Sequence, residues 1–169
     1  TIECNTSSAP AVTGTATAGD NCDGAPVITH SDAVAAGSCS AAIVITRTWT
    51  ATDNCGNTGA DVQMITVIDN SAPMITCPAN VTVECDASTA AANTGTATAT
   101  DDCDSAPGVT SSDSVAAGTC TGTSVITRAW TATDACGNAS DCAQSITIVD
   151  TTVPAIACPA NVTVECDAS

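Results

Sequence analysis

The sequence repeats itself at a spacing of 81 residues. After a shift by that distance, about 48 of the first 81 positions are identical and no gap is needed. Five cysteines then fall on five others: Cys4, Cys22, Cys39, Cys55 and Cys77 on Cys85, Cys103, Cys120, Cys136 and Cys158. Self-similarity at a fixed period indicates a tandem array of one structural module. Because a catalytic pocket is normally built once in a protein, the repeat favours a function that a string of modules performs together.

Cysteine content and charge predict an extracellular protein. Twelve of the 169 residues are cysteine, which indicates a disulfide framework formed in an oxidising compartment. Zinc binding is not expected, because structural zinc sites use Cys-x-x-Cys or Cys/His clusters and His30 is the only histidine. A net charge of -16 argues against partners such as nucleic acid or anionic membrane, which bind Lys and Arg. Without an initiator Met, leader or long apolar run, we expect a mature or excised stretch with no membrane insertion.

Each repeat is expected to form one small domain that depends on its disulfides. Ordering about 80 residues costs on the order of 100 kcal/mol of conformational entropy. The core material is poor, because the chain has no Phe or Tyr and only Trp49 and Trp130 as large aromatics, one per repeat. Disulfides that contribute roughly 2–4 kcal/mol each are then comparable to the whole net stability of such a domain.

The predicted secondary structure is β throughout. Stretches that alternate or are rich in β-branched residues lie at 81–85, 94–100, 125–133 and 145–149. Clusters of Gly, Pro, Asp and Asn separate them, as is typical of turns. About seven short strands with a turn every 8–12 residues predict an all-β fold, one immunoglobulin-like β-sandwich per repeat.

Prolines mark the expected module boundaries, where Pro73 and Pro154 stiffen short linkers. We expect a first module at 1–69 that lacks its first strand, a complete second module at 70–150 and the first strands of a third at 151–169. Two explanations of why the first and third modules are incomplete stay open. The favoured one is that the chain is a stretch of a longer array. The other is that the tail from Thr151 completes the first module of a neighbouring copy as a donor strand.

Three motifs carry a resemblance to a known family. The module start at 154–164 reads PAIACPANVTV, the late turn at 130–138 reads WTATDACGN, and the closing strand at 146–150 reads ITIVD. Together with their repeats they resemble the hyalin repeat over essentially the whole chain. The resemblance implies an immunoglobulin-like extracellular module, found in tandem in adhesive surface and matrix proteins, and its cysteine-rich form resembles long bacterial surface arrays. It also implies a disulfide between first-strand Cys77 and last-strand Cys142.

The expected sandwich topology supplies the remaining cysteine pairs. The loops that contain Cys103 and Cys136 share one end of such a sandwich, and Cys85 and Cys120 share the other. We therefore predict five disulfides: Cys4–Cys39, Cys22–Cys55, Cys77–Cys142, Cys85–Cys120 and Cys103–Cys136. The first repeat has no counterpart of Cys77, and Asp61 stands where the counterpart of Cys142 would be, so both members of that pair are missing together.

Acidic loop residues are the candidates for metal binding. In the expected fold they converge at the junction between modules: Asp69, Asp101, Asp102, Asp104, Asp134 and Asn138. Carboxylate and amide oxygens suit calcium, which takes 6–8 oxygen ligands, so calcium is the predicted cofactor. The alternative is that these residues only make turns and keep the chain soluble.

Smaller signals concern sugars and arginines. Four sequons mark potential N-glycosylation at Asn5, Asn80, Asn138 and Asn161. Arg47 and Arg128 lie two residues before the tryptophans on the same strand face, which predicts a cation–π or structural ion-pair role.

The predicted function is structural or adhesive: a disulfide-stabilised extracellular rod or filament on a cell surface or in a matrix. Its expected partners are neighbouring copies or further repeats, and surface glycans or other cells. The alternative is a ligand-binding adhesin module for glycan or ice, with the array as a stalk. Enzymatic activity is not expected, because no histidine recurs to activate a serine.

Overall fold

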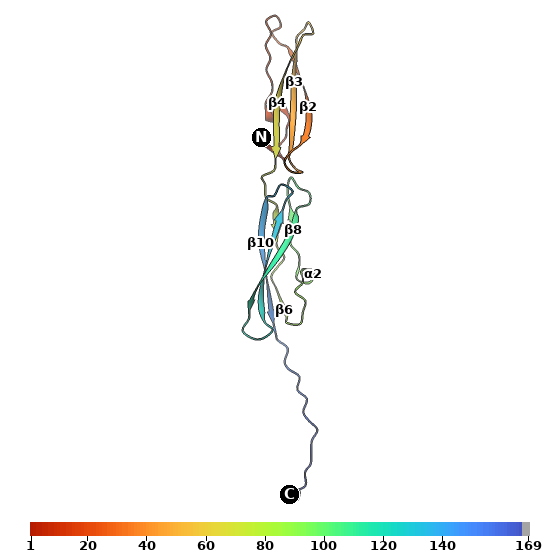
Figure 1. Ribbon diagram of the computed structural model, residues 1–169, viewed down its shortest axis with the longest axis vertical. Coiled ribbons are helices and arrows are strands. Elements are labelled where there is room, and N and C mark those ends of the chain that lie inside the picture. Colours follow the sequence, from red (N-terminus) through yellow and green to blue (C-terminus); the bar gives the residue numbers. More distant parts are fainter. Residues whose placement is uncertain (167–169) are drawn as a thin grey trace.

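The computed structural model describes residues 1–166 and is built mostly of β-strands. The strands form two four-stranded sheets and one two-stranded sheet, and three disulfides link residues of this described part. The prediction of an all-β chain held by disulfides is confirmed at this level. Figure 1 shows the two larger sheets one above the other along the long axis.

The first four-stranded sheet lies within residues 1–69, here called the first repeat. Its strand order is β1 (Ile2–Glu3), β4 (Thr58–Ile68), β3 (Ile43–Thr52) and β2 (Val27–Ala36). β3 pairs antiparallel with both neighbours, whereas the short β1 runs parallel to β4. The β-branched residues of β3 and β4 supply the buried cluster of Ile45, Ile65 and Val67.

The second four-stranded sheet lies within residues 70–150, the second repeat. Its order is β6 (Val81–Glu84), β10 (Ala139–Val149), β9 (Ser124–Thr133) and β8 (Gly108–Ala117). The bounds of β8, β9 and β10 lie 81 residues after those of β2, β3 and β4, as do those of the one-turn helices α1 (Pro10–Thr13) and α2 (Ala91–Thr94). The sequence register is therefore also the register of the elements.

One pair of strands occurs only in the second repeat. β5 (Met74–Thr76) pairs antiparallel with β7 (Thr98–Thr100), and β5 lies beside β10 and β9. In the first repeat, residues 17–19 correspond to β7 but form no strand. The described residues of the first repeat therefore contain no counterpart of the β5–β7 pair.

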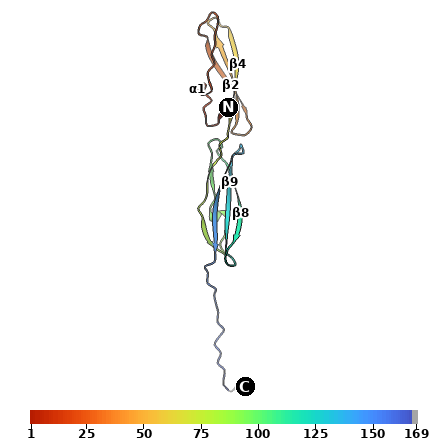
Figure 2. The same ribbon diagram turned by 90° about the vertical axis from the view of Figure 1, so that its left-hand side faces the viewer.

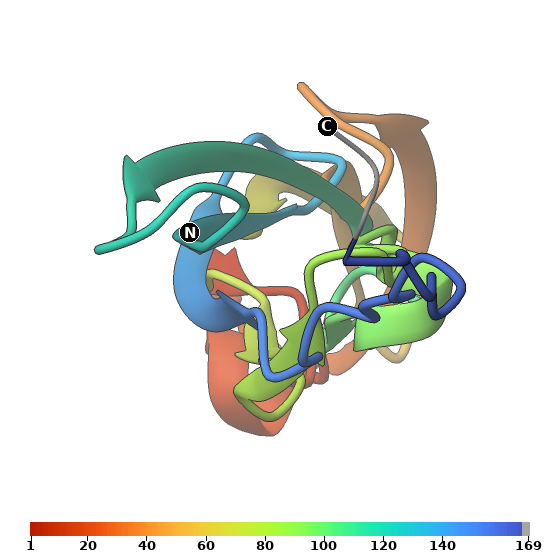
Figure 3. The same cartoon turned by 90° about the horizontal axis from the view of Figure 1, so that it is seen from below.

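The two repeats are stacked end to end, as Figures 1 and 2 show from perpendicular sides. Figure 3 looks along the long axis, where the two repeats lie over one another. Beyond β10, residues 151–165 are exposed and form no strand, and they lead away from the second repeat (Figure 1).

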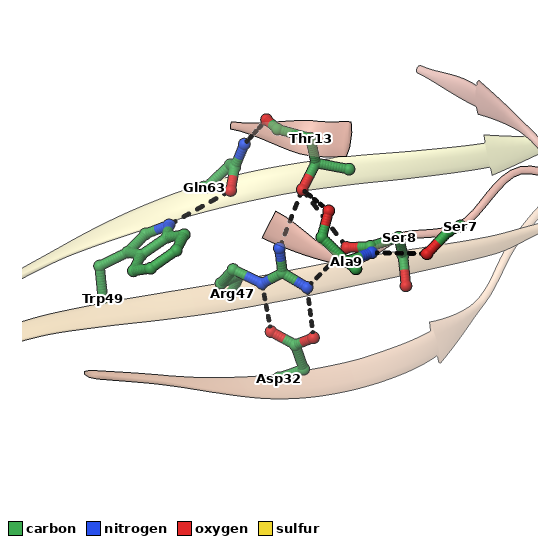
Figure 4. Close-up of polar contacts among 8 residues, drawn as sticks. All are labelled: Ser7, Ser8, Ala9, Thr13, Asp32, Arg47, Trp49 and Gln63. Carbon is green, nitrogen blue, oxygen red and sulfur yellow. Dashed lines mark hydrogen bonds and ion pairs between the residues drawn. The ribbon is translucent and has the colours of Figure 1, made fainter. Parts of the chain in front are cut away.

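Each repeat contains one buried arginine that joins distant segments. Arg47 is 2% exposed and donates from Nε and Nη2 to the two carboxylate oxygens of Asp32, both at 2.7 Å. It also reaches Thr13 Oγ1 and Ser8 O (Figure 4). Its guanidinium carbon lies 5.8 Å from the centre of the Trp49 ring. The predicted ion-pair and cation–π role is confirmed.

Candidate functional site

The most distinctive site is the joint where the two repeats meet. We define the joint as the linker 69–73 together with the four cysteines that form disulfides from one repeat to the other. Two disulfides cross it, Cys4–Cys103 and Cys39–Cys136, with Cα atoms 5.9 and 5.1 Å apart. With the linker, they connect the repeats at three places, so the joint resists both bending and twisting.

The cysteines of the joint come from turns at the ends of strands. Cys4 directly follows β1, and Cys39 lies in the turn between β2 and β3. On the other side, Cys103 follows β7 and Cys136 lies in the turn between β9 and β10. Asp and Gly make these turns: Asp134 Oδ1 accepts from the backbone N–H groups of Cys136 and Asn138, both at 2.8 Å.

Two predicted disulfides are wrong because the cysteines bond across the joint. Cys4 does not pair with Cys39, nor Cys103 with Cys136. The loops of Cys103 and Cys136 do lie together, since Ala135 N donates to Asp104 Oδ2 at 2.9 Å. The prediction failed because it treated each repeat as a closed unit, whereas the partner thiol comes from the repeat stacked on it.

Two more predicted pairs are not formed. Among the described residues, Cys22, Cys55, Cys85 and Cys120 carry free, exposed thiols, so the pairs Cys22–Cys55 and Cys85–Cys120 are corrected. Cys77–Cys142 is confirmed, with Cα atoms 5.9 Å apart, and ties the second repeat internally.

The linker itself is held from both repeats. The Glu3 carboxylate accepts from the backbone and side-chain amides of Asn70, both at 3.2 Å. Asn138 Nδ2 donates to Asp69 O at 3.1 Å, and the Ser140 hydroxyl donates to Pro73 O. Pro73 is fully buried. A linker fixed in this way is part of the packing, not a flexible tether.

Asp69 is an uncompensated buried carboxylate at this linker. It is 6% exposed, its Oδ1 accepts from Ser71 N, and its Oδ2 has no hydrogen-bond partner among the described residues. Burial raises the pKa of Asp69, and the nearby carboxylates of Asp134, Asp101 and Glu3 raise it further. The ionised form is therefore disfavoured unless a positive charge approaches Oδ2.

Asp134 is also buried but stays acidic. Burial opposes its ionisation, yet hydrogen bonds from the Asn138 side chain and from backbone N–H groups in the same turn outweigh it and lower its pKa. Asp134 therefore uses its charge to stabilise a turn, as the alternative to calcium binding proposes.

Of the six predicted calcium ligands, Asp69 and Asp101 come together. Possible ligand atoms of these two and of Cys103 lie within 4.8 Å of one another, but the Cys103 sulfur is bonded to Cys4. Asp104 accepts from Ala106 N and Ala135 N. Asp102 is exposed and accepts from Asn5 at 3.4 Å. Asp69 Oδ2 is thus the one predicted ligand atom that is buried and unpartnered.

The sequon asparagines differ in accessibility. Asn5, Asn80 and Asn161 are exposed. Asn138 is half-buried, and its side-chain amide donates both to Asp69 O and to Asp134 Oδ2. A sugar on Asn138 would break one of these bonds in the joint, so the structure opposes modification there.

A second site missed by the sequence analysis is a groove in the first repeat, here called the edge groove. Its largest part has a volume of about 400 Å³ and lies between residues 14–17 and 61–63, with Trp49 at its floor. It continues past residues 18–20 toward the turn at Asn57. Trp49 is only half-buried, whereas its counterpart Trp130 is 5% exposed.

No family model matches this chain, and no curated protein matches it. The hyalin-repeat identity stays a prediction. Within residues 1–166, no helix is both long and apolar enough to cross a membrane.

Proposed function

We propose that this protein is a structural rod: a run of immunoglobulin-like β-sandwich modules, related to hyalin repeats and joined rigidly end to end outside the cell. The observation that carries the proposal is the pair of disulfides, Cys4–Cys103 and Cys39–Cys136, that cross from one repeat to the next. Domains joined by a single linker move relative to one another by default. Covalent bonds on either side of the linker remove that freedom, which is useful in a filament and of no use to a flexible tether.

The chemistry of the chain supports this location and role. Disulfides form and persist in oxidising compartments, and three are present within residues 1–166. Each disulfide contributes about 2–4 kcal/mol by restricting the unfolded chain, which suits a protein with little aromatic core. The strongly acidic surface keeps such an array soluble and its neighbours apart.

A divalent cation at the joint is a further part of the proposal, supported by Asp69. Its Oδ2 is buried and unpartnered, and one of its carboxylate oxygens lies within 4.8 Å of one of Asp101, so a bound calcium ion would compensate both charges. Such an ion would stiffen the joint further.

The rod is tested by the shape of the chain in solution. We expect small-angle scattering of the oxidised protein to show an elongated particle with one fixed angle between the repeats. Replacing the four joint cysteines by serine should broaden the distribution of angles. The control is the pair Cys77→Ser and Cys142→Ser, which removes a disulfide inside one repeat and should leave the angle unchanged. Two repeats that tumble independently in the oxidised wild type would contradict the proposal.

A further inference from the structure

We infer that the far ends of the two repeats, which contain Cys22 and Cys55 on one side and Cys85 and Cys120 on the other, are the two halves of one more joint, and that a second copy docks there head to tail. Cys85 and Cys120 of one copy then bond to Cys22 and Cys55 of the next. Residues 151–162 of the first copy, here called the tail segment, fill the edge groove of the second. The inference rests on the proposed rod function and names the partner of that rod, which is the chain itself.

The register assigns partners to four of the free thiols. Within the chain, the cysteines at positions 4 and 39 bond to those at 103 and 136. Moving the first two forward by 81 residues leads to Cys85 and Cys120, and moving the last two back leads to Cys22 and Cys55. All four are among the cysteines whose thiols the structure leaves free and exposed, as is Cys158 of the tail segment. Each end of the molecule therefore presents one half of the bonded arrangement seen at its centre.

The loops at both ends already have the geometry of the joint. Near Cys22, Asn54 N donates to Asp23 Oδ2 at 3.0 Å, and the same contact at the joint is Ala135 N to Asp104 Oδ2 at 2.9 Å. At the opposite end, a Cβ added to Gly122 would lie 3.6 Å from Cβ of Cys85, which places that cysteine beside the turn containing Cys120.

The tail segment leaves the second repeat as the linker leaves the first. Glu84 accepts from the backbone N–H and the hydroxyl of Thr151, and these bonds lower its pKa. Glu3 holds Asn70 in the same register position. The chain after Asp150 therefore leaves β10 in the same way as the linker after Asp69 leaves β4.

In the second repeat, the place of the edge groove is filled by residues 73–80. This segment makes contacts all along β10. They are Ser140 with Pro73 O, the Cys77–Cys142 disulfide, Gln144 Nε2 with Ala79 O at 2.8 Å, and Ser145 N with Asn80 Oδ1 at 2.8 Å. Pro78 packs on Gly95, where an added Cβ would lie 2.7 Å from the proline ring. This segment is the internal template for the docked tail.

The first repeat keeps most of what a docked strand needs. Gln63, the counterpart of Gln144, donates to Thr13 O alone among the described residues, which leaves its other amide hydrogen for Ala160 O of the tail segment (Figure 4). Gly14, the counterpart of Gly95, has open space where Pro159 would pack. Ile156 matches Ile75 and is 89% exposed, so its burial in the groove would be favourable.

Two contacts differ. Gly59 stands at the register position of Ser140 and has no hydroxyl to donate to Pro154 O. The other difference explains the importance of the other cysteines. Cys158 of the tail segment would face Asp61, which replaces the counterpart of Cys142. The strand is therefore not bonded covalently inside the groove. The covalent connection depends on Cys85 with Cys22 and on Cys120 with Cys55.

The bond-forming step needs an oxidant of a defined class. Two thiols, one from each copy, lose two protons and two electrons as the sulfur–sulfur bond forms. A disulfide oxidant such as oxidised glutathione accepts them and becomes two thiols. Two bonds at each junction therefore consume two equivalents.

The test oxidises the full chain with a glutathione redox buffer. We expect a ladder of multimers on a non-reducing gel that collapses to one band on reduction. Mixing isotopically light and heavy copies should give hybrid cross-linked peptides that join Cys85 to Cys22 and Cys120 to Cys55, identified by mass spectrometry. Such hybrids prove that the bonds join different copies.

Two complementary variants sharpen the result. One has Cys22→Ser and Cys55→Ser, and the other has Cys85→Ser and Cys120→Ser. Each alone should stay monomeric, and the two together should give a dimer and nothing longer, since only one joint can form. Mass spectrometry of Cys4–Cys103 and Cys39–Cys136 checks that both variants are folded.

Three outcomes would overturn the inference. They are a wild type that stays monomeric after oxidation, bonds that form inside one copy between Cys22 and Cys55 or between Cys85 and Cys120, and a ladder with other pairings. A monomer that is still elongated and carries both joint disulfides would leave the rod function standing. Failure of the rod itself is recognised separately, by repeats that move independently in scattering.

Discussion

At the scale of single residues, the acidic groups divide into those that stabilise the fold and one that opposes it. Asp113 and Asp32 neutralise buried arginines, and Asp134 stabilises a turn. Asp69 has no such compensation on Oδ2. Substitution and pH therefore affect these residues in opposite directions.

The pKa of Asp69 is raised in the folded protein. Its protonated form therefore stabilises the fold fully below the ordinary carboxyl pKa, and this contribution to the free energy of unfolding is lost as pH rises through the raised pKa. Without divalent cations at pH 7, we expect Asp69→Asn to raise the melting temperature by a few degrees. The matched control is Asp150→Asn, at the same register position but exposed, and it should change little.

The same pair of variants tests calcium. Calcium at about 1 mM, within the range used by extracellular modules, should raise the melting temperature of the wild type and of Asp150→Asn but not of Asp69→Asn. Chelator should reverse the rise. A wild type that responds to neither calcium nor chelator contradicts the cation at the joint.

For Asp113, a hydrogen bond from Arg128 lowers the pKa, so its contribution is present above the ordinary carboxyl pKa and is lost as pH falls through the lowered value. Asp113→Asn leaves a buried arginine without its counter-charge. We expect a loss of roughly 1–2 kcal/mol at pH 7, reduced because the carboxylate is partly exposed. The difference from wild type in thermal or urea unfolding should shrink below about pH 4. A constant difference across that range would exclude the ion pair as its cause.

At the scale of elements, the main difference between the repeats is that β5 has no counterpart among the described residues of the first repeat. It leaves Trp49 half-buried at the floor of the edge groove, while Trp130 is covered. One side of the groove is formed by β4, whereas residues 14–20 on the other side form no strand. Strand addition to an existing edge is a common mode of peptide recognition.

A peptide of residues 150–162 with serine in place of Cys158 should bind this groove. We expect Trp49 emission of the full chain to shift to the blue as the ring is buried, and Trp49→Phe should abolish the shift. A peptide with Ile156→Asp should bind roughly tenfold more weakly or worse, because it loses the burial of one apolar side chain. Equal binding of the two peptides would argue against the expected alignment, in which Ile156 occupies the position that Ile75 has in the second repeat.

At the scale of the whole molecule, net charge and covalent joints act against each other. Copies that each carry a charge of -16 repel as they approach, whereas the joints hold them once they are bonded. Salt at about 0.15 M screens charges beyond about 8 Å. Assembly therefore depends on ionic strength, and the stability of the assembled joint depends much less on it.

We expect multimers to form several-fold faster at about 0.15 M salt than at about 0.01 M, because screening shortens the range of the repulsion. Formation of Cys77–Cys142, which lies inside one repeat, is the internal control and should not change. The rates are followed by quenching aliquots and separating them on non-reducing gels. Assembly that slows with salt would point to attraction between oppositely charged surfaces instead.

Several features were predictable because they depend on local pattern. The alternation of β-branched residues and the spacing of turns predicted the β fold, and the repeat register predicted which residues correspond. The resemblance to the hyalin repeat implied Cys77–Cys142, and the role of the two arginines followed from their place two residues before the tryptophans. Of the acidic residues predicted to cluster, Asp69 and Asp101 come together, and the separate roles of the others depend on hydrogen bonds that no pattern reveals.

The cysteine pairing at the joint was not predictable in the same way. In a repeat, a cysteine at a given register position has identical counterparts one period away, so the sequence alone leaves pairing within a repeat and pairing between repeats equally consistent. The pairing is decided by which Cα atoms come within about 6 Å. The sequence by itself determined the repeating unit, its β-strands and its cysteine positions. Only the tertiary structure, by stacking one repeat on the next, decided that these cysteines bond across the joint.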